Sequence, residues 1–330
     1  MNRTLALSLC LCLAGAQSLL AQSAETPPVG FVSKTVPAGA DVTYAPAFHR
    51  SPAFIGEVAT VVNATTLQLT GAPGWTVDQF KQTHYLLVSS GPKEGLFAEI
   101  SGNTASSLSL TFLIGNLGTE QGDAVVSGDQ VKIIPYWTLG TLMPQDSVPN
   151  NTQVFLYNRN QSGVNKSATA IYTHFTGYGW FSGPTNGNNQ ILYPDESVVI
   201  RAPTGVSFTL TQSGSVPLDN VRTLLSNITA GQDQDIRVTS TLPVGTPVGS
   251  LFSPGSAGNG DKLLIFDEAS SGRNKSASMI LTYYTGYGWY SGPSDMNNLQ
   301  IQPAQGIIYR KAGANSAQNI VVNYAPPYNP

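Results

Sequence analysis

Cysteine is almost absent from the chain, and its only two cysteines, Cys10 and Cys12, lie close to the N-terminus. The sequence beyond them therefore excludes disulfide bonds, thiolate metal sites and cysteine nucleophiles. Burial of apolar side chains has to stabilise that part of the chain, and roughly 300 residues are enough for two or three domains.

Charge is also scarce. Charged residues make up 11% of the chain, the formal net charge is −3, and glycine, serine, threonine and asparagine are abundant instead. The sequence has no cluster of lysine and arginine that would neutralise a row of phosphates. Nucleic acid is therefore not expected as a partner.

Long apolar runs are missing except at the start of the chain. There, Arg3 precedes an apolar run over residues 5–16, and the small-residue sites Ala14-Gly-Ala16 and Ala21-Gln-Ser23 follow. This order predicts a secretory signal peptide over residues 1–24. No later stretch approaches the ~18 apolar residues of a membrane-spanning helix. We therefore expect export to the periplasm, the cell surface or the extracellular space, with no transmembrane segment in the mature chain.

Sets of side chains that carry catalysis or bind metals are missing as well. His49, His84 and His174 are far apart and follow no metal-ligand spacing. Nucleophile-elbow, Walker and zinc-protease motifs are absent. No pair of carboxylates stands out for glycoside hydrolysis, although Asp195 and Glu196 are adjacent. The sequence predicts a protein that is not an enzyme and uses no cofactor or metal ion.

The chain does contain a unit of sequence that occurs twice. The peptides Asn165-Lys-Ser-Ala168 and Thr176-Gly-Tyr-Gly-Trp180 return as Asn274-Lys-Ser-Ala277 and Thr285-Gly-Tyr-Gly-Trp289. The offset is constant, since 286 − 177 = 109 for glycine and 310 − 201 = 109 for arginine. Repetition without an insertion indicates two copies of one packing module.

Alternation of apolar and polar residues predicts β-strands along most of the chain, and one helical turn is expected over residues 76–83. In the N-terminal part, strands are expected over residues 57–62, 66–70, 84–89, 96–101 and 107–112. The predicted class is all-β, with a small N-terminal β domain over residues 25–135 and two duplicated β-sandwich-like units over residues 136–239 and 240–330. The two copies form either separate sandwiches or two halves of one larger β structure.

The repeated TGYGW segment is expected to be a strand, in which residues two apart share a face. Tyr178 and Trp180 would then lie on one face, as would Tyr287 and Trp289, with a glycine notch on the other face. Two interpretations remain open for these candidate binding residues. Their rings stack on a sugar, or they fill the core.

Four basic residues recur at the same positions of the two units, namely Lys166 with Lys275 and Arg201 with Arg310. No acidic residue recurs with them at the same offset. We expect these cations to bond carbonyl groups at turns or strand ends while their stems lie on apolar surface. The alternative is that they bind carboxylates of an anionic glycan or of a neighbouring subunit.

Several short motifs follow one another in order ahead of the TGYGW segments: Gly30-Phe-Val32, Val36-Pro-Ala-Gly39, Pro73-Gly-Trp75, Asn103-Thr-Ala105 and Gly128-Asp-x-Val131. Together they resemble an uncharacterised family of exported, β-rich proteins that occurs as several paralogues in verrucomicrobial bacteria. The resemblance implies secretion and supplies no catalytic residue.

These features predict an exported, non-enzymatic β-domain protein with a structural or adhesive role at the cell surface or in extracellular material. Open strand edges can pair with copies of the chain or with other envelope proteins. The alternative is a carbohydrate-binding protein that contacts a polysaccharide through the aromatic residues of the repeated segments.

Overall fold

The computed structural model describes residues 28–71, 73–118, 124–226, 229–253, 255–315 and 320–328. Within these residues the regular structure is almost entirely β-strand, with two one-turn α-helices, so the predicted all-β class is confirmed. The expected signal peptide over residues 1–24 lies outside the described residues. No helix in the described part of the chain is long and apolar enough to cross a membrane.

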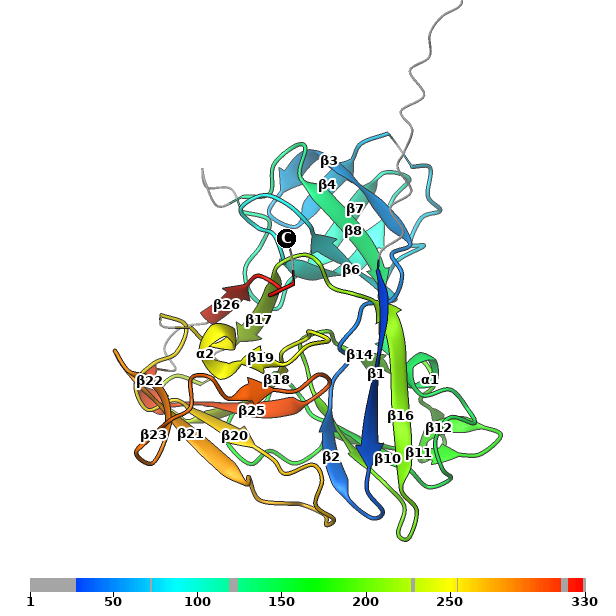
Figure 1. Ribbon diagram of the computed structural model, residues 1–330. Coiled ribbons are helices and arrows are strands. Elements are labelled where there is room, and N and C mark those ends of the chain that lie inside the picture. The colour runs from blue at the N-terminus through cyan, green and yellow to red at the C-terminus, as the bar shows by residue number, and fades with distance from the viewer. Residues whose placement is uncertain are drawn as a thin grey trace, which may run out of the picture.

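Residues 54–135 form a closed six-stranded barrel, which lies at the top of Figure 1. Its strands are β3 (Phe54–Asn63), β4 (Thr66–Leu69), β5 (His84–Val88), β6 (Phe97–Asn103), β7 (Ser107–Thr111) and β8 (Gln130–Pro135), paired in the order β3-β4-β7-β6-β5-β8. The strands expected in this region are confirmed, because alternate residues fill the barrel interior. The helical turn expected over residues 76–83 is wrong, because this segment forms consecutive turns and no helix.

The remaining strands form two repeats of one arrangement, which lie side by side below the barrel in Figure 1. The first repeat contains β1 (Val29–Val36), β2 (Asp41–Tyr44), β9 (Trp137–Thr138), α1 (Leu139–Leu142), β10 (Gln153–Leu156), β11 (Ala170–Phe175), β12 (Gly179–Ser182), β13 (Thr185–Asn186), β14 (Ile191–Leu192), β15 (Val198–Arg201) and β16 (Phe208–Ser215). The second contains β17 (Val221–Leu225), β18 (Gln234–Thr239), β19 (Thr246–Pro247), α2 (Val248–Leu251), β20 (Lys262–Ile265), β21 (Met279–Tyr284), β22 (Gly288–Ser291), β23 (Ser294–Asp295), β24 (Gln300–Ile301), β25 (Gly306–Lys311), the 3-10 turn η1 (Gly313–Asn315) and β26 (Ile320–Tyr324).

Each repeat contains a six-stranded sheet, in the order β13-β12-β11-β10-β15-β2 in the first and β23-β22-β21-β20-β25-β18 in the second. Two two-stranded ladders and the one-turn helix contribute to the same core as the sheet. Those ladders are β1-β16 and β9-β14 in the first repeat and β17-β26 and β19-β24 in the second. The layers therefore pack face to face, as in a sandwich.

Sheet membership does not follow the domain boundaries expected at residues 135 and 239. Strand β2 pairs with β15, with Asp41 opposite Arg201, and β18 pairs with β25, with Asp235 opposite Arg310. The first repeat thus begins before the barrel, and the barrel is inserted between β2 and β9. The second repeat begins at β17, inside the range expected for the first. Comparison of the two copies in the sequence does not reveal that β2 corresponds to β18, because the offset of 109 residues holds only after the inserted barrel. The equivalent residues Asp41 and Asp235 are instead 194 residues apart (235 − 41 = 194).

The two repeats contact each other through matched hydrogen bonds. The Asp41 amide donates to the carbonyl of Gly272 at 2.9 Å, and the Asp235 amide donates to the carbonyl of Gly163 at 3.0 Å. Gly163 and Gly272 are equivalent positions, since 272 − 163 = 109. Each repeat therefore gives the other the same bond, as in an isologous dimer interface.

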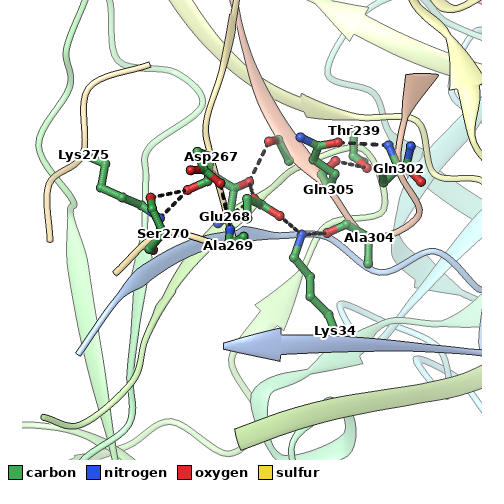
Figure 2. Close-up of polar contacts among 12 residues, drawn as sticks. Lys34, Thr239, Asp267, Glu268, Ala269, Ser270, Lys275, Gln302, Ala304 and Gln305 are labelled. Atoms are coloured by element: carbon green, nitrogen blue, oxygen red, sulfur yellow. Dashed lines mark hydrogen bonds and ion pairs between the residues drawn. The ribbon is translucent and has the colours of Figure 1, made fainter. Parts of the chain in front are cut away.

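Not every contact between the repeats has a matched counterpart. Lys34 on β1 forms an ion pair with Glu268, which follows β20, and donates to the carbonyl of Ala304 at 3.1 Å (Figure 2). Both charged side chains are mostly buried, at 10% and 15% exposure. Arg159 occupies the position of Glu268 in the first repeat, since 268 − 109 = 159, so the pair forms in one direction only.

Candidate functional site

The repeated TGYGW segment forms the tip of a hairpin, and its assignment as a continuous strand is wrong. Strand β11 ends at Phe175 and β12 begins at Gly179, while the Tyr178 amide donates to the Phe175 carbonyl at 2.9 Å to close the turn. Gly177 and Gly179 have φ angles of 81° and 90°, which residues with a side chain rarely adopt. Because the chain reverses here, the two-residue alternation does not continue through the segment.

The two tryptophans of the segment belong to the cores of the repeats. Trp180 and Trp289 are fully buried. Their indole N–H groups donate to the carbonyls of Met143 at 3.0 Å and of Phe252 at 3.1 Å. A ligand cannot stack on them, so their assignment as binding residues is corrected to a role in the core.

The two tyrosines of the segment have the opposite environment. Tyr178 and Tyr287 are each 73% exposed, because they occupy the turn and not the strand. The expectation that each shares a face with its tryptophan is therefore wrong. Both tyrosines nevertheless remain available to a ligand, and the two copies present them equally.

Further aromatic side chains flank each exposed tyrosine. We call the set Phe175, Tyr178, Phe181 the first hairpin tip and the set Tyr284, Tyr287, Tyr290 the second hairpin tip. The flanking rings pack edge to face within each tip, with centroids 6.1 Å apart in both copies. In the strand expected from the sequence, these flanking aromatic residues border the glycine notch and carry no role of their own. The signal that identifies them is the recurrence of an aromatic residue at both positions in both copies.

A shallow hollow that is wide open to solvent lies against the first hairpin tip, and Asn150, Thr176 and Gly183 complete its lining. None of these lining side chains is charged. The Asn150 side-chain oxygen accepts a hydrogen bond from the Thr176 amide at 3.1 Å, and Asn259 does the same for Thr285 at 3.3 Å. The same polar residue therefore holds the turn in both copies.

The recurring lysines lie away from the hairpin tips and brace loops. Lys166 donates to the carbonyl of Gln161 at 2.7 Å. Lys275 donates to the carbonyls of Asp267 at 2.6 Å and Ser270 at 3.0 Å (Figure 2). Burial lowers the pKa of Lys166, and the nearby Asp235 carboxylate partly opposes this shift. These contacts match the expectation that the lysines bond carbonyl groups at turns.

The recurring arginines have carboxylate partners that the sequence pattern does not reveal. Arg201 donates to both oxygens of Asp41, at 2.6 and 2.8 Å, and Arg310 donates to both oxygens of Asp235, at 2.6 and 2.9 Å. These hydrogen bonds raise the pKa of each arginine. The partners lie on β2 and β18, outside the stretch over which the offset of 109 holds, so no recurring acid is visible in the sequence.

The described residues hold no group of three or more histidine, cysteine, aspartate or glutamate side chains that could bind a metal ion. His174 is fully buried in the first repeat, and its ring nitrogens contact the carbonyls of Gln145 and Pro149.

Comparison of the chain with protein-family models, curated proteins and solved structures found no match. The candidate site is therefore defined by the geometry of the two hairpin tips.

Proposed function

We propose that this protein is an exported, non-enzymatic adhesive protein that binds neutral polysaccharide through its two hairpin tips. The observation that carries the proposal is the equal exposure, 73%, of Tyr178 and Tyr287 at equivalent tips. Burying a large aromatic ring stabilises a fold, whereas leaving it in water does not. Binding of a ligand at each ring accounts for their recurrence at the surface.

The chemistry of the hairpin tips favours a sugar. Tyrosine and phenylalanine rings present flat apolar faces to the C–H groups of a pyranose, and the tyrosine hydroxyl adds a polar edge. The hollow at the first tip has amide and hydroxyl groups at its border, from Asn150 and Thr176, and no charged lining residue. A neutral polysaccharide therefore suits the site better than an anionic one.

The arrangement of the two hairpin tips favours adhesion over a grip on one chain. The strands that carry them, β12 and β22, lie at opposite sides of the molecule in Figure 1. Two sites that face apart engage separate polysaccharide molecules, so each protein molecule bridges them. At the outer edges of the two six-stranded sheets, strand pairing between copies receives less support, because β13 and β23 have only two residues each.

The test compares retention and bridging in variants of the tips. The double variant Tyr178→Ser, Tyr287→Ser is expected to lose retention on insoluble cellulose, xylan and mannan. Each single variant keeps one site, so it is retained but no longer makes a soluble β-glucan turbid by cross-linking. Phe31→Ser is the matched control, because Phe31 is an exposed aromatic residue, at 77%, on β1.

Thermal unfolding of each variant checks that the fold is intact, since substitutions at exposed positions change stability by no more than about 0.5 kcal/mol. Failure of the wild-type protein to bind any of these polysaccharides would refute the proposal, as would full retention of the double variant. Fractionation of the source cells tests export separately, and recovery of the protein in the cytoplasm would contradict it.

A further inference from the structure

A cavity of about 380 Å³ lies between the two repeats. Equivalent residues from both copies line it, in the pairs Asp41 with Asp235, Asn165 with Asn274, Lys166 with Lys275, Val199 with Ile308 and Tyr157 with Phe266. This volume falls in the range of about 300–1,000 Å³ that small-molecule sites occupy.

Reciprocal hydrogen bonds at the border of the cavity fix its shape. The Asn274 amide donates to Asp41 at 2.7 Å, and the Asn165 amide donates to Asp235 at 2.7 Å. Both asparagines have a φ of 50°, in the left-handed region that asparagine tolerates better than most residues. Because backbone groups and paired side chains form this border, it is held in place before any ligand binds.

One pair of equivalent positions in the cavity holds two different residues, Thr43 in the first repeat and Arg237 in the second. Thr43 is satisfied, because its hydroxyl lies within hydrogen-bond distance of the Gly306 carbonyl, at 2.6 Å, and of the Glu268 carboxylate, and can donate to either. Arg237 stacks on the ring of Tyr157, with 3.6 Å between its guanidinium carbon and the ring centroid. The described residues give its guanidinium no hydrogen bond and no ion pair. Stacking covers one face of this group and leaves the N–H donors along its edge unused.

The charges around the cavity leave an excess of positive charge. Asp41 and Asp235 are each paired with an arginine of their own repeat, as described above. Lys166, Lys275 and Arg237 line the same cavity without a carboxylate bonded to them. Two more carboxylates, those of Asp195 and Glu196, lie next to the cavity, and each contacts Arg159 at 2.8 Å.

We propose that this cavity binds a small organic carboxylate, whose two oxygens accept the unused N–H donors of Arg237. The planar guanidinium matches a carboxylate with two parallel hydrogen bonds. Val42, Leu264 and Ile308 provide an apolar wall for the carbon body of the ligand. Inorganic phosphate has no carbon body to contact this apolar wall, so it is expected to bind more weakly than a carboxylate that has one.

The test measures binding of benzoate and of glucuronate to the full chain by calorimetry and by ligand-observed NMR, with inorganic phosphate as a third probe. These two carboxylates distinguish an apolar ring body from a sugar body. Saturable binding of at least one carboxylate is expected. Arg237→Gln, which keeps a polar side chain but removes the guanidinium and its charge, is expected to weaken that binding at least tenfold.

Two further variants distinguish ligand binding in the cavity from a purely structural role of Arg237. Ser276→Phe places a bulky ring at the lining of the cavity while it keeps every cation, so it should weaken binding even if Arg237→Gln fails to fold. Lys81→Gln removes one positive charge from the distant barrel, where Lys81 pairs with Asp78, and should bind as the wild type does. Absence of saturable carboxylate binding, equal affinity in Ser276→Phe, or phosphate binding as tight as that of the carboxylates would each overturn the proposal. The site is independent of the hairpin tips, so either proposal can fail without the other.

Discussion

Trp180 and Trp289 are the largest fully buried side chains of the two repeats, and each has its N–H group satisfied by a carbonyl of the chain. Truncation at such a position removes a large apolar area and leaves a cavity and an unpaired carbonyl. Tyr178 and Tyr287, two residues earlier, lie in water. Neighbouring aromatic residues of one short segment thus have separate roles, stability for tryptophan and contact for tyrosine.

Trp289→Ala is expected to lower the free energy of unfolding by about 3–5 kcal/mol. Tyr287→Ala should change it by no more than about 0.5 kcal/mol, because the side chain is exposed. Equilibrium unfolding in guanidinium chloride measures both values. A small effect of the tryptophan substitution would show that the core of the second repeat does not depend on this residue.

Glu196 makes stability depend on pH. Burial raises its pKa from 4.5 to about 7, although the adjacent Arg159 opposes this shift. Between these two values the folded protein binds more protons at Glu196 than the unfolded chain does, so the contribution of this group to stability falls as pH rises. In Glu196→Gln this dependence is absent. The unfolding free energy of wild type minus that of the variant should therefore decrease from pH 5 to pH 7.5, and an increase would contradict the assignment.

At the scale of elements, the hairpin tips depend on two glycines that differ in their surroundings. A methyl group added at Gly177 would have its nearest neighbour, in the side chain of Gln145, 4.0 Å away. The same group at Gly179 would lie 2.3 Å from the side-chain oxygen of Asn188, which accepts the hydrogen bond of the Trp180 amide. Only the second position combines a strained φ with a steric clash.

Gly177→Ala is expected to destabilise the protein by about 1–2 kcal/mol, the penalty of a left-handed φ for alanine. Gly179→Ala should destabilise it further, by an additional 1–3 kcal/mol or so, because the hydrogen bond to Trp180 is displaced. Thermal and chemical unfolding of the two variants gives the comparison. Equal destabilisation by the two substitutions would show that Asn188 moves aside at no cost in the free energy of unfolding.

Much of the strand content follows from alternation, and the structure confirms it where alternate residues face a core, as in β3 and β7. The hairpin tip could not be predicted in this way. Its five residues alternate in size like a strand, and only the positive φ of Gly177 and Gly179 reveals a turn. The partners Asp41 and Asp235 were also hidden, because pairing between distant strands leaves no spacing in the sequence.

At the scale of the whole molecule, the barrel is an insertion whose two ends lie close together. The Trp137 side chain, just after the barrel, donates to the carbonyl of Phe48, just before it, at 2.8 Å. Strands β2 and β9 on either side belong to the first repeat. An insertion of this kind can be replaced by a short linker without breaking the sheet that surrounds it.

Replacement of residues 51–135 by a short glycine-serine linker should therefore leave the two repeats folded, with reduced stability. Part of that reduction comes from exposing Ile191 and Tyr193, which pack against Tyr136 and the barrel residue Tyr85. Circular dichroism and gel filtration measure the fold, and retention on polysaccharide measures the hairpin tips. An unfolded or aggregated product would show that the barrel is needed for the repeats to form.

The interruption of the first repeat also sets an order for assembly. Val36 on β1 pairs with Phe208 on β16, and 172 residues separate them (208 − 36 = 172). As the chain emerges from its N-terminal end, β1 and β2 therefore wait unpaired while the barrel closes from local contacts. The second repeat has a shorter delay, because Val221 on β17 pairs with Tyr324 on β26 only 103 residues later (324 − 221 = 103). A chaperone that shields the early strands during synthesis would thus protect the part of the protein most exposed to aggregation.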